Sequence, residues 1–145
     1  MRLLTLILIL TINNLTSQEL KNIDNTKSSI SYSGNHFLHK WSAENNNLSG
    51  LLKIDNENIL NIGIVAKVAD FKSGNSSLDS NSYRVLEALK FPNIIFKSIS
   101  IKSQNGLSNI KGLIEFHGIE KDIDVNVELT KIDNTTQING QFTLN

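Results

Sequence analysis

The sequence predicts an all-β domain of antiparallel strands with one helical insertion. Short runs alternate apolar and polar residues with a period of two, as strands do. Turn-forming residues such as Asn105-Gly106 separate these runs, and only residues 76–90 show helical spacing. The 145 residues suffice for one domain with its own core and are too few for two ordinary domains. Many short strands in one domain predict a sandwich or a barrel.

Residues 121–131 give the clearest strand, because four apolar residues alternate with four polar ones. We expect Ile123, Val125, Val127 and Leu129 to point inward. Residues 62–69 show the same pattern, with Ile62, Ile64, Ala66 and Val68 on the inner face. The remaining expected strands cover residues 28–33, 41–47, 48–54, 93–101, 107–116 and 137–144.

The strand at residues 93–101 is partly apolar on both faces, and the charge of Lys97 favours an inward Phe96. Ile94, Ser98 and Ser100 would share the face of Phe96. Turns are expected at residues 55–58, 104–106, 117–118 and 133–134, and Gly34-Asn35 is expected to break the first strand. Gly50 is read as a bend or bulge.

The helical segment has apolar residues at Tyr83, Leu86 and Leu89. Ser77 or Asp79 is expected to cap its start. The helix must end by Phe91, because Pro92 disfavours the α conformation in the residue before it.

The N-terminus has the features of a cleaved signal peptide. Arg2 precedes an apolar run at residues 3–12, which is too short for a membrane span. We expect cleavage after Ser17, no transmembrane stretch in residues 18–145, and a periplasmic or secreted location.

The composition argues against several functional classes. The 14 basic and 14 acidic residues balance, so no basic face for nucleic acid is indicated. The absence of cysteine removes disulfides, thiolate catalysis and Cys-ligated zinc. We find no nucleophile elbow and no phosphate-binding glycine loop, and therefore predict no catalytic residues.

His36, His39 and His117 are the only histidines. Together they could bind zinc or copper if the fold brought them within ligating distance. We favour hydrogen-bonded histidines at turns or rims and predict no metal site.

The stretch at residues 86–98, LEALKFPNIIFKS, resembles a signature of the YceI-like family, the polyisoprenoid-binding, lipocalin-like proteins of the bacterial periplasm. The family pattern is a helical segment, an aromatic-proline pair and a strand with an inward Phe and a Ser. Phe91, Pro92, Phe96 and Ser98 match it. Residues 112–121 resemble a second signature, a strand entering a His-Gly turn that ends in Lys. Residues 73–80 and 36–41 resemble further family motifs, so the resemblance extends from about residue 27 to residue 144.

Two departures accompany the resemblance. Family members often have Arg and His around the Asp-Ser of the insertion, where this chain has Leu78 and Asn81. They also usually continue through one more strand, so this sequence is either truncated or closes its barrel with fewer strands. An unclosed edge after Leu144 would be exposed to pairing with other chains.

The resemblance implies an antiparallel lipocalin-like β-barrel of about eight strands with one short helical insertion. It also implies a non-enzymatic carrier of an isoprenoid-like or other long-chain amphiphile, with no cofactor besides that ligand. A homodimer is left open. From the residues alone, the same side chains would form an ordinary core. The alternative function is a β-domain for stress protection or adhesion without a cavity. The expected lining residues are Ile64, Val68, Leu86, Leu89, Ile94, Phe96, Ile114, Phe116, Val125 and Val127.

Overall fold

A computed structural model describes residues 18–36, 39–56 and 58–144. Seven of its strands form one antiparallel sheet in the order β1-β4-β5-β6-β7-β8-β9, and β2 pairs with β3 in a separate hairpin. The elements are β1 (Glu19–Asn22), β2 (Ile30–His36), β3 (His39–Asn45), β4 (Leu48–Asp55), β5 (Asn58–Lys67), the 3-10 turn η1 (Val68–Asp70), α1 (Ser76–Val85), β6 (Asn93–Gln104), β7 (Leu107–Phe116), β8 (Ile119–Ile132) and β9 (Thr135–Gly140).

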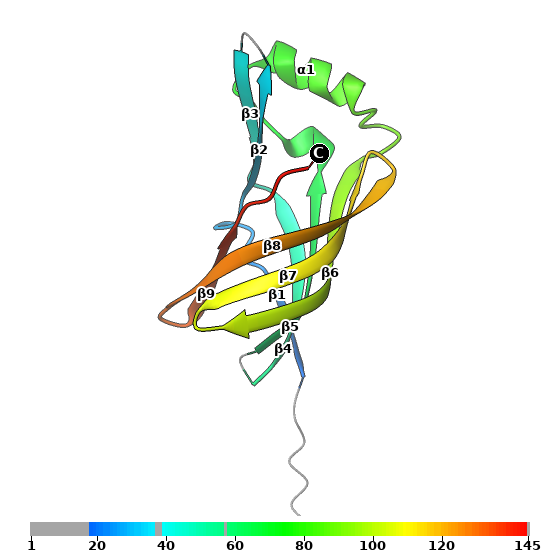
Figure 1. The fold of residues 1–145 in the computed structure, drawn as a ribbon. Coiled ribbons are helices and arrows are strands. Elements are labelled where there is room, and N and C mark those ends of the chain that lie inside the picture. The colour runs from blue at the N-terminus through cyan, green and yellow to red at the C-terminus, as the bar shows by residue number, and fades with distance from the viewer. Residues whose placement is uncertain (1–17, 37–38, 57, 145) are drawn as a thin grey trace, which may run out of the picture.

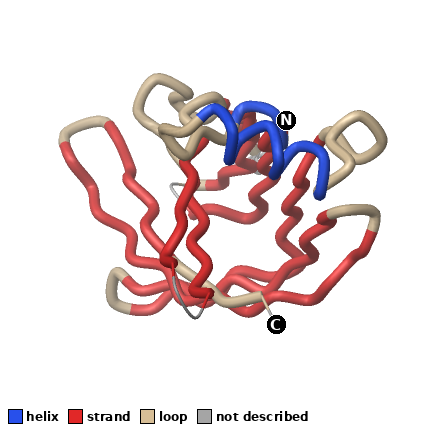
Figure 2. Tube along the Cα trace, turned by 90° about the horizontal axis from the view of Figure 1, so that it is seen from above, coloured by secondary structure: helices blue, strands red, loops and turns tan. Residues whose placement is uncertain are grey.

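The seven-stranded sheet curls into a half-barrel, as Figure 1 shows. The predicted antiparallel, lipocalin-like fold with one short helix is therefore confirmed. Within the described ranges β1 and β9 end the sheet on either side and do not pair with each other. Seen from above in Figure 2, α1 crosses over one end of the strands.

Two apolar clusters lie inside the molecule. The end cluster joins the β2–β3 hairpin to the sheet through buried Ala43, Leu48, Ala66 and Phe71. The concave cluster occupies the inner face of the curl, and its buried members are Ile62, Ile110, Val125 and Val127. Ile123, Val125 and Val127 are buried as predicted, and Leu129 packs against the concave cluster.

Register aligns the inward side chains in rows across neighbouring strands. Ile64 of β5 lies opposite Phe96 of β6, which lies opposite Ile114 of β7. The Phe96 ring lies over Gly112, where an added Cβ would clash with the ring. The prediction that Phe96 points inward is therefore confirmed, because it packs against the concave cluster and Lys97 is exposed.

The predicted face of β6 is wrong beyond Ser98. The register shifts between Ser98 and Ser100, and Ile99 is 61% exposed. Ser100 then lies opposite exposed Lys111, whereas Ile101 joins the concave cluster. The Ser98 hydroxyl accepts a hydrogen bond of 2.8 Å from the backbone N–H of Ile62, just beyond the last β5–β6 pair. A bulge therefore reverses the alternation that the sequence suggests.

Gly34 does not break the first strand, because β2 continues through it to His36. Gly34 lies opposite Trp41, whose indole ring occupies the space that a side chain at position 34 would need. The sequence therefore has glycine here for close packing and not for a turn. Gly50 is likewise no bulge, since the irregularity in β4 lies between Lys53 and Ile54.

The helix is shorter than predicted and starts differently. It ends at Val85, and turns follow up to Lys90. Its N-cap is Asn75, whose side chain accepts hydrogen bonds from the N–H groups of Ser77 and Leu78. Neither Ser77 nor Asp79 caps it, because the Asp79 carboxylate binds Ser73 instead.

The predicted turns at residues 55–58, 104–106, 117–118 and 133–134 connect paired strands. Asn105 and Gly106 both have positive φ, as the Asn-Gly hairpin requires. The predicted signal peptide lies outside the described residues. None of the helices in the described part of the chain has the length and apolar character to cross a membrane.

We expect Gly112→Ala to lower the free energy of unfolding by about 1–3 kcal/mol, because the methyl group would overpack the interior. Its carbon would lie 2.5 Å from the Lys97 carbonyl oxygen and would meet the Phe96 ring. Gly63→Ala is the matched control, since its new methyl group would meet nothing closer than the Phe96 carbonyl oxygen at 4.0 Å. Urea unfolding measures the free energy of unfolding of both variants, and equal values would contradict this packing.

Candidate ligand-binding site

Half of the predicted lining residues meet on the concave face. Val125 and Val127 are members of the concave cluster, and Ile64 and Phe96 pack against that cluster. Buried Ile114 lies opposite Phe96 on the neighbouring strand. These side chains come from β5, β6, β7 and β8, so the apolar residues of the concave face extend across four neighbouring strands.

The other predicted residues lie elsewhere. Val68 is buried in η1, and Ile94 packs against the end cluster. Leu86 and Phe116 are half-buried, one after α1 and one at the end of β7. Leu89 is fully exposed, with a relative accessibility of 103%, so it does not line the interior.

Several apolar residues that border the concave cluster were not predicted as lining residues. Ile101 was not included because the bulge in β6 hides its inward direction. Alternation within strands would have identified Leu129 and Ile138, which we placed on strands but not in the site. The partly buried residues around the cluster are Leu52, Ile59, Ile64, Phe96, Ile101, Leu129 and Ile138.

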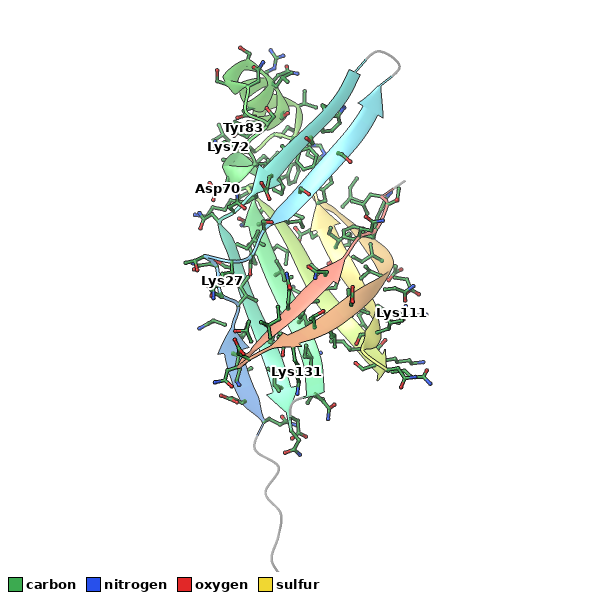
Figure 3. All side chains as sticks on the ribbon, turned by 90° about the vertical axis from the view of Figure 1, so that its left-hand side faces the viewer. Lys27, Asp70, Lys72, Tyr83, Lys111 and Lys131 are labelled. Atoms are coloured by element: carbon green, nitrogen blue, oxygen red, sulfur yellow. The ribbon has the colours of Figure 1, made fainter. Side chains whose placement is uncertain are left out.

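The segment that enters α1 is fastened to the end cluster by polar contacts. The Tyr83 hydroxyl donates a hydrogen bond of 2.8 Å to the carbonyl of buried Phe71, and Lys72 Nζ donates one of 2.8 Å to the same hydroxyl. This bond to Tyr83 raises the pKa of Lys72. Figure 3 shows Lys72 and Tyr83 close together beside the helix. Burial raises the pKa of Tyr32, whose ring packs on Phe71 with the centroids 5.0 Å apart.

Asp79 completes this attachment. Its Oδ1 accepts hydrogen bonds from the Ser73 hydroxyl at 2.6 Å and from the Ser73 N–H at 2.8 Å. Both bonds favour the ionised carboxylate, and they hold the pKa of Asp79 below its usual range. Asp79 is therefore a structural carboxylate at the start of the insertion.

The histidines do not form a described metal site. His117 Nε2 lies 2.9 Å from Glu87 Oε2, and the side chains of His36 and His39 lie outside what the structure describes. His36 and His39 are backbone partners in the β2–β3 hairpin, whereas His117 is in the β7–β8 turn. Among the residues with described side chains, no three His, Asp or Glu gather around a common point.

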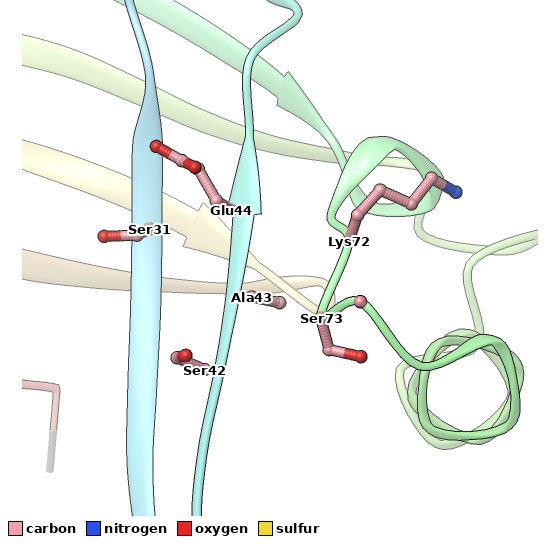
Figure 4. Close-up of a pocket in the computed structure, with 7 residues that line it drawn as sticks. Ser31, Ser42, Ala43, Glu44, Lys72 and Ser73 are labelled. Carbon is pink, nitrogen blue, oxygen red and sulfur yellow. The ribbon is translucent and has the colours of Figure 1, made fainter.

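Two open, polar hollows lie beside the β2–β3 hairpin, outside the concave face. The larger, about 470 Å³, includes Ser31, Glu44, Lys72 and Ser73 in its lining. Figure 4 shows the side chains of Ser31 and Glu44 pointing away from those of Lys72 and Ser73. The smaller, about 390 Å³, shares Glu44 and Lys72 with it. In the larger hollow these side chains do not point toward a common centre, and polar residues predominate in the lining of both hollows.

Comparison with known proteins identifies the family. The model of the YceI-like domain matches residues 22–145. The chain belongs to the YceI-like family. In this YceI-like chain, Phe96 and Ser98 of the first signature have structural roles, one over Gly112 and one bonded to Ile62. At the two positions where the insertion departs from the family motif, Leu78 is exposed and Asn81 accepts a hydrogen bond from Arg84.

Solved structures share the fold of this YceI-like domain. Burkholderia cenocepacia BcnA superposes with a TM-score of 0.74 at 19% identity, over 81% of this chain and 77% of that chain. The Campylobacter jejuni YceI protein superposes with a TM-score of 0.51 at 17% identity, over 93% of this chain and 72% of that chain. A comparison with curated protein sequences gave no match.

We expect Ser73→Ala to raise the pKa of Asp79 part of the way to its usual value, because the hydroxyl bond is lost and the N–H bond remains. A depressed folded-state pKa stabilises the fold above the unfolded-state pKa, and this contribution disappears as the pH falls through the folded-state pKa. Carboxyl ¹³C NMR titration measures the change. Asp24 is the control, because Thr26 lowers its pKa and Ser73 does not contact it. An unchanged Asp79 titration would contradict the assignment.

Proposed function

We propose that this protein is an exported, non-catalytic carrier. In this proposal, an isoprenoid-like or other long-chain amphiphile binds along the concave face of the half-barrel, and the protein is periplasmic or secreted. The main support for this proposal is that seven apolar side chains around the concave cluster are only partly buried. A linear hydrocarbon laid across them would remove both its own surface and theirs from water.

The energetics favour an apolar ligand of this shape. Burial contributes about 25 cal/mol per Å² of apolar surface, so roughly 200 Å² would give about 5 kcal/mol before the costs of association. Half-barrel walls present apolar side chains from neighbouring strands, which suits an extended chain better than a compact polar molecule. The apolar run at residues 3–12 supports export.

The second candidate is a β-domain for stress protection or adhesion that holds no ligand. It is favoured by the position of the two hollows, both of which lie outside the concave face. In that case the partly buried residues would simply be the margin of an ordinary core.

Titration with geranylgeraniol, followed by native mass spectrometry of the complex, separates the two. The carrier predicts a saturable complex of defined stoichiometry, and lipid extraction of freshly purified protein should release a long-chain amphiphile. The second candidate predicts neither. Absence of both a titratable and a co-purifying amphiphile would contradict the carrier.

We expect Phe96→Ala to weaken geranylgeraniol binding about tenfold, since losing some 60 Å² of apolar contact costs roughly 1.4 kcal/mol. Isothermal titration calorimetry measures the dissociation constant. Ile95→Ala is the matched control, because Ile95 is the neighbour on the opposite face of β6 and lies across from Glu115. Equal weakening by both variants would show that general destabilisation, and not loss of ligand contact, causes the effect.

A further inference from the structure

The segment that leaves α1 is built around an unusual backbone position. Glu87 follows the helix with φ of +46°, a value that non-glycine residues seldom adopt. Its carbonyl accepts hydrogen bonds from the N–H groups of Lys90 and Phe91 at 2.8 and 2.9 Å, which tightens the chain into a turn before Pro92. The Glu87 side chain is thereby placed at the end of the insertion, where it can contact another element.

The element that it contacts is the β7–β8 turn. His117 and Gly118 form this turn with φ of +52° and +72°. His117 Nε2 lies 2.9 Å from Glu87 Oε2. Figure 1 shows the segment after α1 descending beside the turn between β7 and β8. Two segments that are thirty residues apart in sequence are therefore joined by one side-chain pair.

Phe91 adds an apolar contact to this pair. Its ring meets the His117 imidazole edge to face, with centroids 4.8 Å apart and planes at 65°. The ring also lies over Gly118, where an added Cβ would be 2.5 Å from Phe91 Cε1. Lys90 Nζ lies 4.8 Å from the centroid of the Phe91 ring and 3.9 Å from Glu87 Oε1. We call Glu87, Phe91, His117 and Gly118 the strap contact.

The insertion is held mainly at its two ends. No residue of α1 is buried, and Leu89 is fully exposed. The helix itself is attached at both ends: Asp79 in its first turn binds Ser73, and Tyr83 in its last turn donates a hydrogen bond to the carbonyl of buried Phe71. The end of the insertion depends on the strap contact, where the His117 and Glu87 side chains are 35% and 49% exposed. Exposed pairs are weak, so this end is the one that opens more readily.

We propose that the strap contact is a releasable fastening for the helical insertion. Breaking it lets residues 86–90 move away from the β7–β8 turn while α1 stays attached through Asp79 and Tyr83. That movement opens the end of the half-barrel that α1 crosses, and an amphiphile enters and leaves there. The role in ligand exchange rests on the proposed function, whereas the fastening itself does not.

Hydrogen exchange tests the fastening without any ligand. His117→Asn and Glu87→Asn remove the pair, and asparagine tolerates the positive φ at both positions. Each should speed amide exchange at residues 86–90 at least fivefold relative to the native protein. Asn81→Ala is the control, because it removes only the exposed hydrogen bond from Arg84. Unchanged exchange in both Asn variants would overturn the fastening.

A crosslink tests the role in ligand exchange. The chain has no cysteine, so Glu87→Cys with His117→Cys introduces the only two thiols. A short bis-maleimide then joins them. The probe is 11-(dansylamino)undecanoic acid, and the measured quantity is the rate at which excess unlabelled undecanoic acid displaces it. This rate should be at least tenfold lower in the crosslinked protein than in the same variant before crosslinking. It should be at least threefold higher in His117→Asn than in the native protein. Equal rates would overturn entry at this end. If neither this probe nor geranylgeraniol binds the native protein, the proposed function and the exchange role fail together, and hydrogen exchange still decides the fastening.

Discussion

The row of Ile64, Phe96 and Ile114 across β5, β6 and β7 is the packing contact on which the architecture depends. The Phe96 ring needs the bare backbone of Gly112 beside it, so one small residue and one large residue fix the inner face at the centre of the sheet. Once that face is fixed, the alternation of β8 places Ile123, Val125 and Val127 on the same side. The concave cluster is the consequence.

The sequence predicted the strands well where one face alone is apolar. The polar residues that alternate along β8 leave only one possible inner face, and Ile123, Val125 and Val127 on that face are buried. In β6 both faces are apolar, and the hydrogen bond from Ile62 to Ser98 accompanies a bulge that no period-two pattern contains. Gly34 was misread as a break because its partner across the hairpin, Trp41, is not known until β2 and β3 are paired.

The residues of the candidate site could be predicted where apolar and polar side chains alternate along a strand. Ile64, Phe96, Val125 and Val127 share the concave face, because each lies on the inner face of its strand. Leu89 was included because of helical spacing, yet the helix ends at Val85 and the leucine is exposed on a turn. No pattern in the sequence predicts the contact between Glu87 and His117, because it joins the segment after α1 to a hairpin turn thirty residues away.

In the proposed function, the concave face binds the ligand and the polar hollows take no part. This central claim is tested most directly by intermolecular NOEs between bound geranylgeraniol and ¹³C-labelled isoleucine and phenylalanine side chains. The account predicts NOEs to Ile64, Ile101 and Phe96 on the concave face and none to Ile95 on the outer face. NOEs confined to the outer face, or to the exposed residues of the insertion, would contradict it.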